Sequence, residues 1–340
     1  MFIVDAHLDL AYNALRGRAV LRPAREQNAD AEGIPSVGLP DLRAGQVGLI
    51  CATIFCAPAT PREPGYRNAD EAHAMALEQL GWYQEQDDAG QMQLVRTPAD
   101  LPAAHARARI PSILLLEGAD PIRTPDDVPL FYDRGVRIVG LAWRQTRYCG
   151  GTGCPGPLTA EGVKLIPELD RFDIIHDTSH LAEESFWQLL DRTAGRIMAS
   201  HSNCRSIIPT DRQLSDPMIR AIAARGGVIG INFYDRFLVP SPEHGKRRAT
   251  LLDIVRHVRH MCDLLGDADH VGIGTDMDGG LGREQIPVEI ETSADLPRVA
   301  DALSAAGFPD PAVQGIMGTN WLRFFSTALP ATLPSRRENA

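Results

Sequence analysis

The sequence has no long apolar run and no cluster of basic residues. No stretch approaches the roughly 20 consecutive apolar residues that a membrane-spanning helix needs. The 34 Lys and Arg residues are outnumbered by 44 Asp and Glu residues, which gives a formal net charge of −10. A chain with this charge balance is not expected to bind nucleic acid or an anionic membrane surface. We therefore predict neither of these as a partner.

Aromatic residues and closely spaced cysteines are also scarce. Phe, Trp and Tyr make up 6% of the chain and apolar residues 44%, so aliphatic side chains must fill the core. None of the six cysteines forms a CxxC pair, and Met1 is not followed by the basic and apolar segments of a secretory signal. These features predict a reduced, cytoplasmic protein. Cys149 and Cys154 share a Gly-rich loop, where two free thiols are favoured over a disulfide.

Short, nearly continuous apolar segments recur along the chain. They are rich in Ile, Val and Leu, as strands buried on both faces should be. Amphipathic segments at Asp70–Asp88, Leu181–Asp191 and Leu251–Leu265 have helical spacing. Eight strands alternating with helices predict an α/β protein with a (β/α)8 TIM barrel, and an open doubly wound sheet is the alternative. The eight predicted strands are Phe2–Ala6, Val47–Phe55, Ser112–Leu116, Val136–Ala142, Phe172–Ile175, Arg196–Ser200, Gly227–Phe233 and Val271–Thr275.

The length fits one barrel with insertions. A TIM barrel commonly has about 250 residues, and we expect a single catalytic domain over residues 1–326 of the 340. The segment Arg16–Gln46 is long for a connection between a strand and a helix, and we interpret it as an excursion over the barrel. The tail at 327–340 is polar and interrupted by Pro, which predicts disorder.

Metal-ligand side chains stand where several predicted strands end. His7 and Asp9 follow the first strand, Glu117 the third, His180 the fifth and His201 the sixth. The carboxyl ends of barrel strands share one rim, where active sites of this fold lie. A cluster of imidazoles and carboxylates suits zinc or a similar divalent metal. The sequence therefore predicts a metal site at this rim.

The spacing of these residues fits two metal ions. Positions i and i+2 of a strand face the same way, so His7 and Asp9 can chelate one ion. Glu117 can bridge two ions through its two oxygens, and His180 and His201 can hold the second. Two ions roughly 3.5–4 Å apart can share a water, lower its pKa and stabilise a developing oxyanion. We expect two Zn²⁺, or another divalent metal, per chain.

Each residue alone also has a structural explanation. A single histidine at a strand end more often makes a structural hydrogen bond, and Glu117 could lie beside a helix N-cap. Four strand ends that all carry ligand-type residues favour the metal cluster. His176 competes with His180 as a ligand. His257 and His260 lie three residues apart on one helix and are expected on a solvated face.

Five motifs in this order resemble the membrane (renal) dipeptidase family of zinc peptidases, which is amidohydrolase-like: VDAHLD, LLLEGAD, DTSHLAEESF, ASHSNCRSI and GIGTDMDG. The segments LPDLRAGQVGL, GVIGINFY and GTNWLRFF extend the resemblance over nearly the whole chain. The resemblance implies that His7 and Asp9 bind the first zinc. It also implies that Glu117 bridges both ions and that His180 and His201 bind the second.

The resemblance implies further roles. Asp276 matches the aspartate that passes a proton from the bridging water to the leaving amine, with Asp278 as the alternative. Arg212 matches an arginine that pairs with the carboxylate of the dipeptide, and Tyr234 matches a tyrosine that contacts substrate. Family members often have a histidine after the fourth strand, where this sequence has Trp143. This departure leaves the substrate range open, including cleavage of L,L-dipeptides.

The predicted function is hydrolysis of dipeptides, including those with a C-terminal D residue, by a metal-bridging hydroxide. One alternative is an amidohydrolase acting on a lactam, an N-acyl amino acid or another small amide. Many such enzymes bridge their metals with a carbamylated lysine, whereas Lys164 and Lys246 lie at no strand end. A non-catalytic binding protein is the remaining alternative, which the complete ligand set disfavours. The physiological substrate and the oligomeric state stay open, with a homodimer as one option.

Overall fold

A ring of parallel strands forms the centre of the molecule. The computed structural model describes residues 1–61, 64–102, 108–240 and 244–331. Eight parallel strands follow one another in the order β10-β11-β1-β2-β4-β5-β8-β9, and a parallel bridge between Ala199 and Ile229 joins the two ends. An additional strand, β3, pairs with β4 outside this ring. The strand bounds are β1 Ile3–Leu8, β2 Val47–Phe55, β3 Met92–Leu94, β4 Ile110–Glu117, β5 Val136–Gly140, β6 Cys149–Gly151, β7 Cys154–Leu158, β8 Ile175–Asp177, β9 Ile197–Met198, β10 Ile229–Ile231 and β11 Val271–Ile273.

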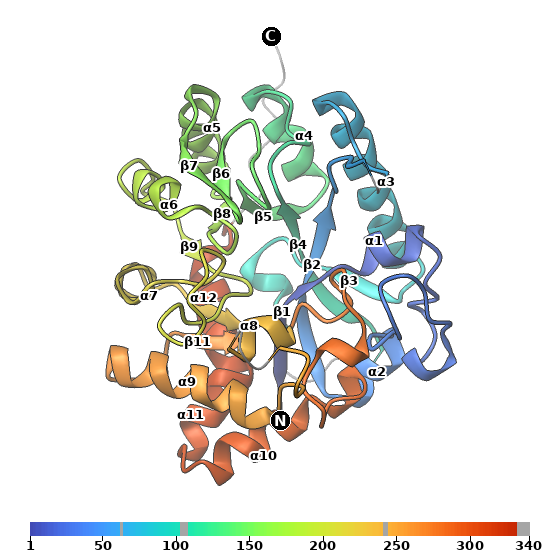
Figure 1. The fold of residues 1–340 in the computed structure, drawn as a ribbon. Coiled ribbons are helices and arrows are strands. Elements are labelled where there is room, and N and C mark those ends of the chain that lie inside the picture. Colours follow the sequence, from blue (N-terminus) through green and yellow to red (C-terminus); the bar gives the residue numbers. More distant parts are fainter. Residues whose placement is uncertain (62–63, 103–107, 241–243, 332–340) are drawn as a thin grey trace.

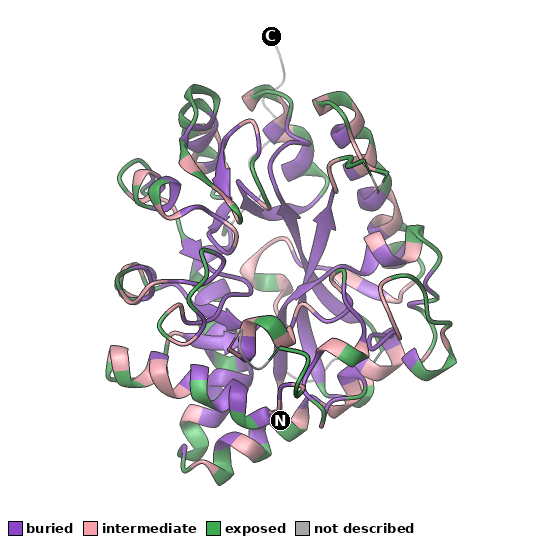
Figure 2. Cartoon of the chain, in the orientation of Figure 1, coloured by how far each residue is buried: buried purple, intermediate pink, exposed green. Residues whose placement is uncertain are grey.

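Helices surround the ring (Figure 1). The strands at the centre are buried, and the helices turn exposed faces outward (Figure 2). The predicted (β/α)8 barrel is confirmed, because each of the eight predicted segments overlaps one strand of the ring. The helix bounds are α1 Leu10–Leu15, α2 Leu39–Ala44, α3 Ala69–Asp88, α4 Val128–Asp133, α5 Ala160–Arg171, α6 Glu183–Leu190, α7 Asp216–Ala224, α8 Asp235–Leu238, α9 Leu251–Leu265, α10 Pro297–Ala305, α11 Asp310–Gln314 and α12 Asn320–Ala328.

The strands are buried on both faces, which explains their apolar runs. On β4, Ile113 and Leu115 belong to a smaller apolar cluster, whereas Leu114 and Leu116 belong to the larger cluster that includes the surrounding helices. Successive side chains of a strand point to opposite faces. Glu117 follows Leu115 by two residues and therefore lies on the same face as Ile113 and Leu115. This alternation brings its carboxylate to the inner side of the barrel rim.

The C-terminal helix α12 packs into the smaller cluster. Trp321 is fully buried there, and its Nε1 donates a hydrogen bond to the carbonyl of Ile273 on β11 at 3.1 Å. Of the tail predicted at 327–340, the first two residues complete α12, and 332–340 lie outside the described residues. The single-domain boundary at 326 stays a prediction. None of the helices in the described ranges is long and apolar enough to cross a membrane.

The loop that contains Cys149 and Cys154 forms an antiparallel hairpin of β6 and β7. A side chain at Gly150 would place its Cβ 2.5 Å from the backbone nitrogen of Gly156, so only glycine allows the two strands to approach this closely. Both cysteines are free thiols. The hairpin tip at Thr152 and Gly153 reaches the rim of the barrel and takes part in the site described below.

The excursion at Arg16–Gln46 is held to the same rim by Asp278. The backbone nitrogens of Ser36 and Val37 and the hydroxyl of Ser36 donate hydrogen bonds to the Asp278 carboxylate at 2.7–3.1 Å. Arg18 lies 3.3 Å from the same carboxylate. Asp278 thus uses both of its oxygens to fix a loop.

Candidate metal centre

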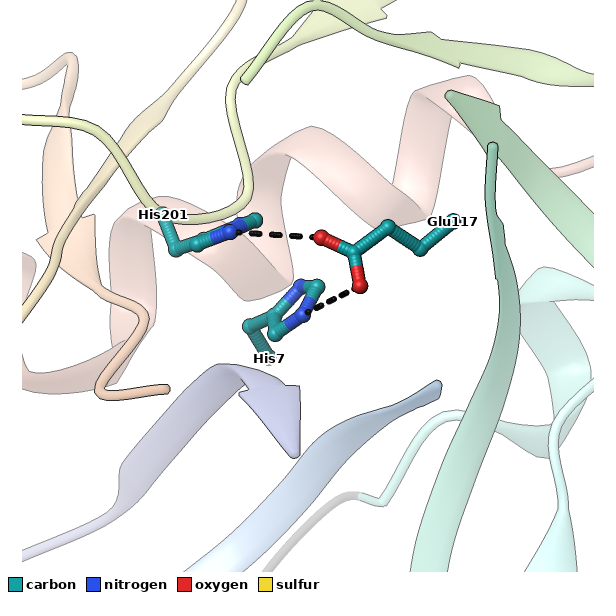
Figure 3. A group of neighbouring side chains, drawn as sticks. All are labelled: His7, Glu117 and His201. Atoms are coloured by element: carbon teal, nitrogen blue, oxygen red, sulfur yellow. Dashed lines mark ion pairs between the residues drawn. The ribbon is translucent and has the colours of Figure 1, made fainter. Parts of the chain in front are cut away.

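The five predicted ligands converge at the carboxyl ends of β1, β4, β8 and β9. The Glu117 carboxylate lies between the rings of His7 and His201, with one oxygen toward each (Figure 3). The distances are 3.6 Å from His7 Nε2 to Oε2 and 3.5 Å from His201 Nε2 to Oε1. His180 Nε2 lies 3.0 Å from Glu117 Oε1 and 3.0 Å from His201 Nε2. Three imidazole nitrogens therefore face one carboxylate.

Two overlapping groups of residues could hold a metal ion. One consists of His7, Glu117 and His201, and the other of His7, Asp9 and Asp276; within each group the ligand atoms lie within 4.8 Å of one another. His7 Nε2 and Asp9 Oδ1 are buried and have no hydrogen-bond partner among the described residues. Buried polar atoms are normally satisfied, and an orphan needs a physical reason. A cation bound between these atoms would satisfy both, so the residues present fit a divalent metal.

Hydrogen bonds outside the centre fix how two of the imidazoles face it. The Ser200 hydroxyl donates to Asp177 at 2.5 Å and lies 3.1 Å from His7 Nδ1 and 2.7 Å from His201 Nδ1. A hydroxyl has one proton, and an ionised carboxylate can only accept. Ser200 must then accept from both imidazoles, which puts a proton on each Nδ1 and, in the neutral imidazole, leaves the Nε2 lone pair facing the centre. This is the tautomer that a metal ligand requires.

Two further contacts hold the ligand strands. Thr152, at the tip of the β6–β7 hairpin, lies 2.9 Å from His180 Nδ1 and orients the third imidazole. The buried Asp5 carboxylate accepts hydrogen bonds from the backbone and hydroxyl of Thr275 at 2.8 and 2.6 Å, and from the backbone of His7 at 3.3 Å. Asp5 thereby ties the end of β1 to the end of β11. Asp5, Thr152, Asp177 and Ser200 were not among the residues predicted from the sequence, although Asp5, Asp177 and Ser200 lie inside the ligand motifs.

Charge in the centre is unbalanced. Burial, together with the nearby charge of Glu117, raises the pKa of Asp9 well above its ordinary value and that of Asp276 to about 6. Burial favours the neutral imidazole of His7, but the nearby carboxylates outweigh it and raise the pKa of His7 to about 10. Burial lowers the pKa of His180 to about 4 and that of His201 well below its usual range. Crowded carboxylates beside neutral imidazoles are stabilised by a bound cation.

Asp276 lies beside this cluster in an unusual backbone conformation. Its φ is 59°, in the left-handed region that non-glycine residues rarely adopt. Asn232 donates a hydrogen bond to Asp276 Oδ2 at 2.9 Å. A side chain at Gly279 would place its Cβ 2.0 Å from Asp276 Oδ1, so glycine is needed there. The carboxylate is held in one position, with Oδ2 occupied and Oδ1 turned toward the space next to Gly279.

Asp278 does not compete with Asp276 for a catalytic role. Its carboxylate is 2% exposed and is engaged by Ser36, Val37 and Arg18, as described above. It does not line the cavity, whereas Asp276 does.

A cavity of about 380 Å³ opens directly over the centre. Asp9, Glu117, His180 and Asp276 form its floor, and aromatic side chains form much of its wall. The predicted substrate-contacting residues Trp143, Tyr234 and Arg212 all line it. The Trp143 ring packs edge-on against Phe55 with centroids 5.0 Å apart. The volume suits a small molecule.

Arg212 is buried but not fully engaged. Its Nη1 donates to the Ser179 carbonyl at 2.8 Å and to the Ser202 hydroxyl at 3.0 Å, and its Nη2 donates to the His201 carbonyl at 2.6 Å. Its Nε is buried with no hydrogen-bond partner in the part of the chain that the structure describes. These contacts fix a guanidinium at the cavity with a donor left for a ligand.

Two other histidines lie outside the centre. His176 Nε2 is 2.7 Å from Asp170 Oδ1, on the side of β8 that faces α5, so the structure places His180 and not His176 at the cluster. The prediction of a solvated face is wrong for His257, which is fully buried and whose Nδ1 accepts a hydrogen bond from the Cys204 backbone at 3.1 Å. Burial lowers the pKa of His257 to about 3. His260 is half-buried and contacts Asp216 at 2.9 Å.

Comparison with known proteins gives a consistent result. A Klebsiella pneumoniae protein of unknown function, encoded in the pqqA 5′ region, is 33% identical over 247 residues, which are 69% of this chain and 88% of that protein. The crystal structure of the dipeptidase AC, a metallopeptidase of family M19, is 27% identical with a TM-score of 0.81 and covers 98% of this chain and 99% of its own. A Rhodobacter sphaeroides metallopeptidase, liganded with a phosphinate mimic of L-Ala-D-Ala, is 27% identical with a TM-score of 0.81 over 96% of this chain and 98% of its own.

The sequence profile of one family covers almost the entire chain. The profile "Membrane dipeptidase (Peptidase family M19)" matches residues 1–336. The resemblance inferred from the sequence motifs is confirmed by this match. A family of metallopeptidases implies a divalent metal, and the barrel rim carries residue groups that could hold one. The chain belongs to the membrane dipeptidase family, peptidase family M19.

Proposed function

We propose that this protein is a dipeptidase that uses two divalent metal ions, with zinc as the preferred metal. The observation that carries the proposal is the convergence of five ligand side chains around Glu117, with His7 Nε2 and Asp9 Oδ1 buried and unpartnered. His7 and Asp9 would hold one ion, His180 and His201 the other, and Glu117 both. Mixed imidazole and carboxylate ligands are typical of zinc.

The ions and the protein residues have separate tasks. When bound, two such ions lower the pKa of a shared water and polarise the scissile carbonyl. Asp276 takes up a proton at Oδ1 and delivers it to the leaving amine, because Asn232 already occupies Oδ2. Asn232 and Gly279 keep that carboxylate in place.

Arg212 selects short substrates that end in a carboxylate. A guanidinium recognises a carboxylate through parallel N–H donors, and its Nε is the donor left unused in the fold. A carboxylate anchor in the same cavity as the metal ligands favours short substrates over long chains. Acceptance of a C-terminal D residue is supported by the similar Rhodobacter protein and its L-Ala-D-Ala mimic. Trp143 and Tyr234 would shape the pocket for the substrate side chains.

Metal removal and reconstitution test the proposal. The purified protein is stripped with a chelator, reloaded with Zn²⁺, Mn²⁺ or Co²⁺, and assayed on L,L- and L,D-dipeptides, N-acyl amino acids and lactams. We expect about two ions per chain and dipeptide hydrolysis that depends on them. If only lactams or N-acyl amino acids are hydrolysed, the protein is an amidohydrolase of a different substrate class and the dipeptidase proposal is wrong. Undiminished hydrolysis by the metal-free protein would remove the metal from the reaction.

A further inference from the structure

A second arginine lines the cavity and has no assigned role. Arg144 follows Trp143 just beyond the end of β5 and lies at the mouth of the cavity, where its side chain is exposed. Among the described residues, no carboxylate lies within ion-pairing distance of it and no hydrogen bond engages its side chain. Arg147, three residues later, is by contrast paired with Asp120 at 3.5 Å. Arg144 is therefore a cation that the fold leaves unused.

The hairpin β6–β7 lies directly against the backbone of Arg144. A side chain at Gly151 would bring its Cβ within 2.3 Å of the Arg144 carbonyl, so the two backbones are in direct contact. The guanidinium reaches the hairpin tip, where Nη2 lies 4.0 Å from the position that a Cβ on Gly153 would occupy. Gly153 is itself fixed, because its backbone nitrogen donates to Asp211 at 2.8 Å. The charge thus lies beside the hairpin tip, on the part of the cavity lining that contains Gly153.

The charges around the cavity then have a clear arrangement. The carboxylates of Asp9, Glu117 and Asp276 lie at the floor, where bound metal ions would neutralise them. Arg212 is buried near the floor and Arg144 is exposed at the mouth. In the described lining these are the two arginines, and a substrate with one terminal carboxylate pairs with only one of them.

We propose that Arg144 forms a subsite for a second carboxylate, so that the preferred substrates are dipeptides with an acidic side chain. This inference rests on the proposed function, with Arg212 holding the terminal carboxylate. An arginine binds a carboxylate through two parallel hydrogen bonds and distinguishes it from an uncharged amide of the same shape. Arg144 is a specificity-determining residue in this arrangement and takes no part in bond cleavage.

Isosteric substrate pairs provide the test. The zinc-loaded protein is assayed on Ala-Glu against Ala-Gln and on Glu-Ala against Gln-Ala, each with an L or a D second residue. We expect kcat/KM to be higher for the acidic member by at least about fivefold, the upper end for an exposed ion pair, because bound substrate also shields the guanidinium from water. The pair that shows the preference identifies which residue of the dipeptide reaches Arg144. Added salt should weaken the preference.

Three substitutions of Arg144 and a matched control distinguish the effect of its charge on substrate preference from the effect of its shape. Arg144→Gln should bring the ratio of acid to amide close to one, Arg144→Glu should invert it, and Arg144→Lys should retain part of it. Arg220→Gln removes an exposed arginine from α7, remote from the cavity lining, and should keep the wild-type ratio.

A wild-type ratio of one, or an unchanged ratio in Arg144→Gln, would overturn the subsite. In that case, hydrolysis of Ala-Gln or Gln-Ala would still support the proposed dipeptidase function. If the metal-loaded protein cleaves no member of the panel, the proposed function fails and the subsite fails with it.

Discussion

Replacing Ser200 by alanine should weaken binding of both metal ions. The Ser200 hydroxyl accepts from His7 Nδ1 and His201 Nδ1, so it orients one predicted ligand of each ion. Loss of such an outer hydrogen bond typically costs about 10- to 100-fold in metal affinity. Because one hydroxyl serves two imidazoles, we expect a loss of this size for each ion, or about 1.4–2.7 kcal/mol per ion.

Competition with a chromophoric chelator measures the two dissociation constants directly. Ser112→Ala is the matched control, since it removes a buried hydroxyl on β4 that donates only to the Ile110 carbonyl at 2.9 Å. Ser112→Ala loses one buried hydrogen bond, which costs about 1 kcal/mol of stability, whereas Ser200→Ala also loses the bond to Asp177, so the folding of both variants is checked before metal is added. Only Ser200→Ala should change metal affinity. Wild-type affinity in Ser200→Ala would refute the argument that Ser200 sets the tautomer of the two histidines.

Three further variants test the other assignments. Glu117→Ala should lose most of its metal by elemental analysis, and retention of two ions would remove Glu117 from the bridge. Asp276→Asn should keep the fold and the metal while kcat falls by about 10²- to 10⁴-fold, the usual contribution of a positioned acid or base; wild-type kcat would exclude Asp276 as the proton carrier. Arg212→Met and amidation of the substrate C-terminus should each lower kcat/KM by about 10²-fold or more, without a full further loss when combined. Simple additivity of the two losses would show that Arg212 does not contact that carboxylate.

The barrel, and the convergence of the predicted ligand side chains at its rim, could be predicted from the sequence because both depend on local patterns. A strand buried on both faces must be apolar throughout, and the position after its last apolar residue falls at the rim. Glu117 shows this directly: it is separated from Leu115 by one residue and shares its face. Once a strand was predicted, the residue spacing was therefore enough to predict which side chain lies at the rim.

Features that depend on contacts between distant segments were not accessible in the same way. The β6–β7 hairpin contains CGG and CPGPL, whose Gly and Pro residues indicate a loop, and its pairing depends on the close approach of Gly150 and Gly156. The hydroxyl of Thr152 could be assigned to His180 only after the hairpin had been placed.

His257 is a different case, because the sequence contained the signal. Ile254, Val258 and Met261 repeat at helical spacing and form the buried face of α9. His257 follows Ile254 by three residues and precedes Met261 by four, so it lies on that face. The apolar pattern of α9 therefore predicts a buried position for His257. The prediction of a solvated face came instead from treating His257 and His260, three residues apart in the sequence, as one pair.

The end of β11 carries two aspartates with different tasks. Asp278 fastens the segment around Ser36, and Asp276, two residues earlier, faces the metal centre; both have a φ near 60°. A change of length near Ser36 would pull on Asp278 and twist the same short peptide that presents Asp276. Insertions in the excursion should therefore be tolerated better beside the exposed residues Asn28 and Ala29 than near Ser36. The length of the Arg16–Gln46 excursion, which lies outside the cavity, is therefore expected to affect the position of Asp276 inside it.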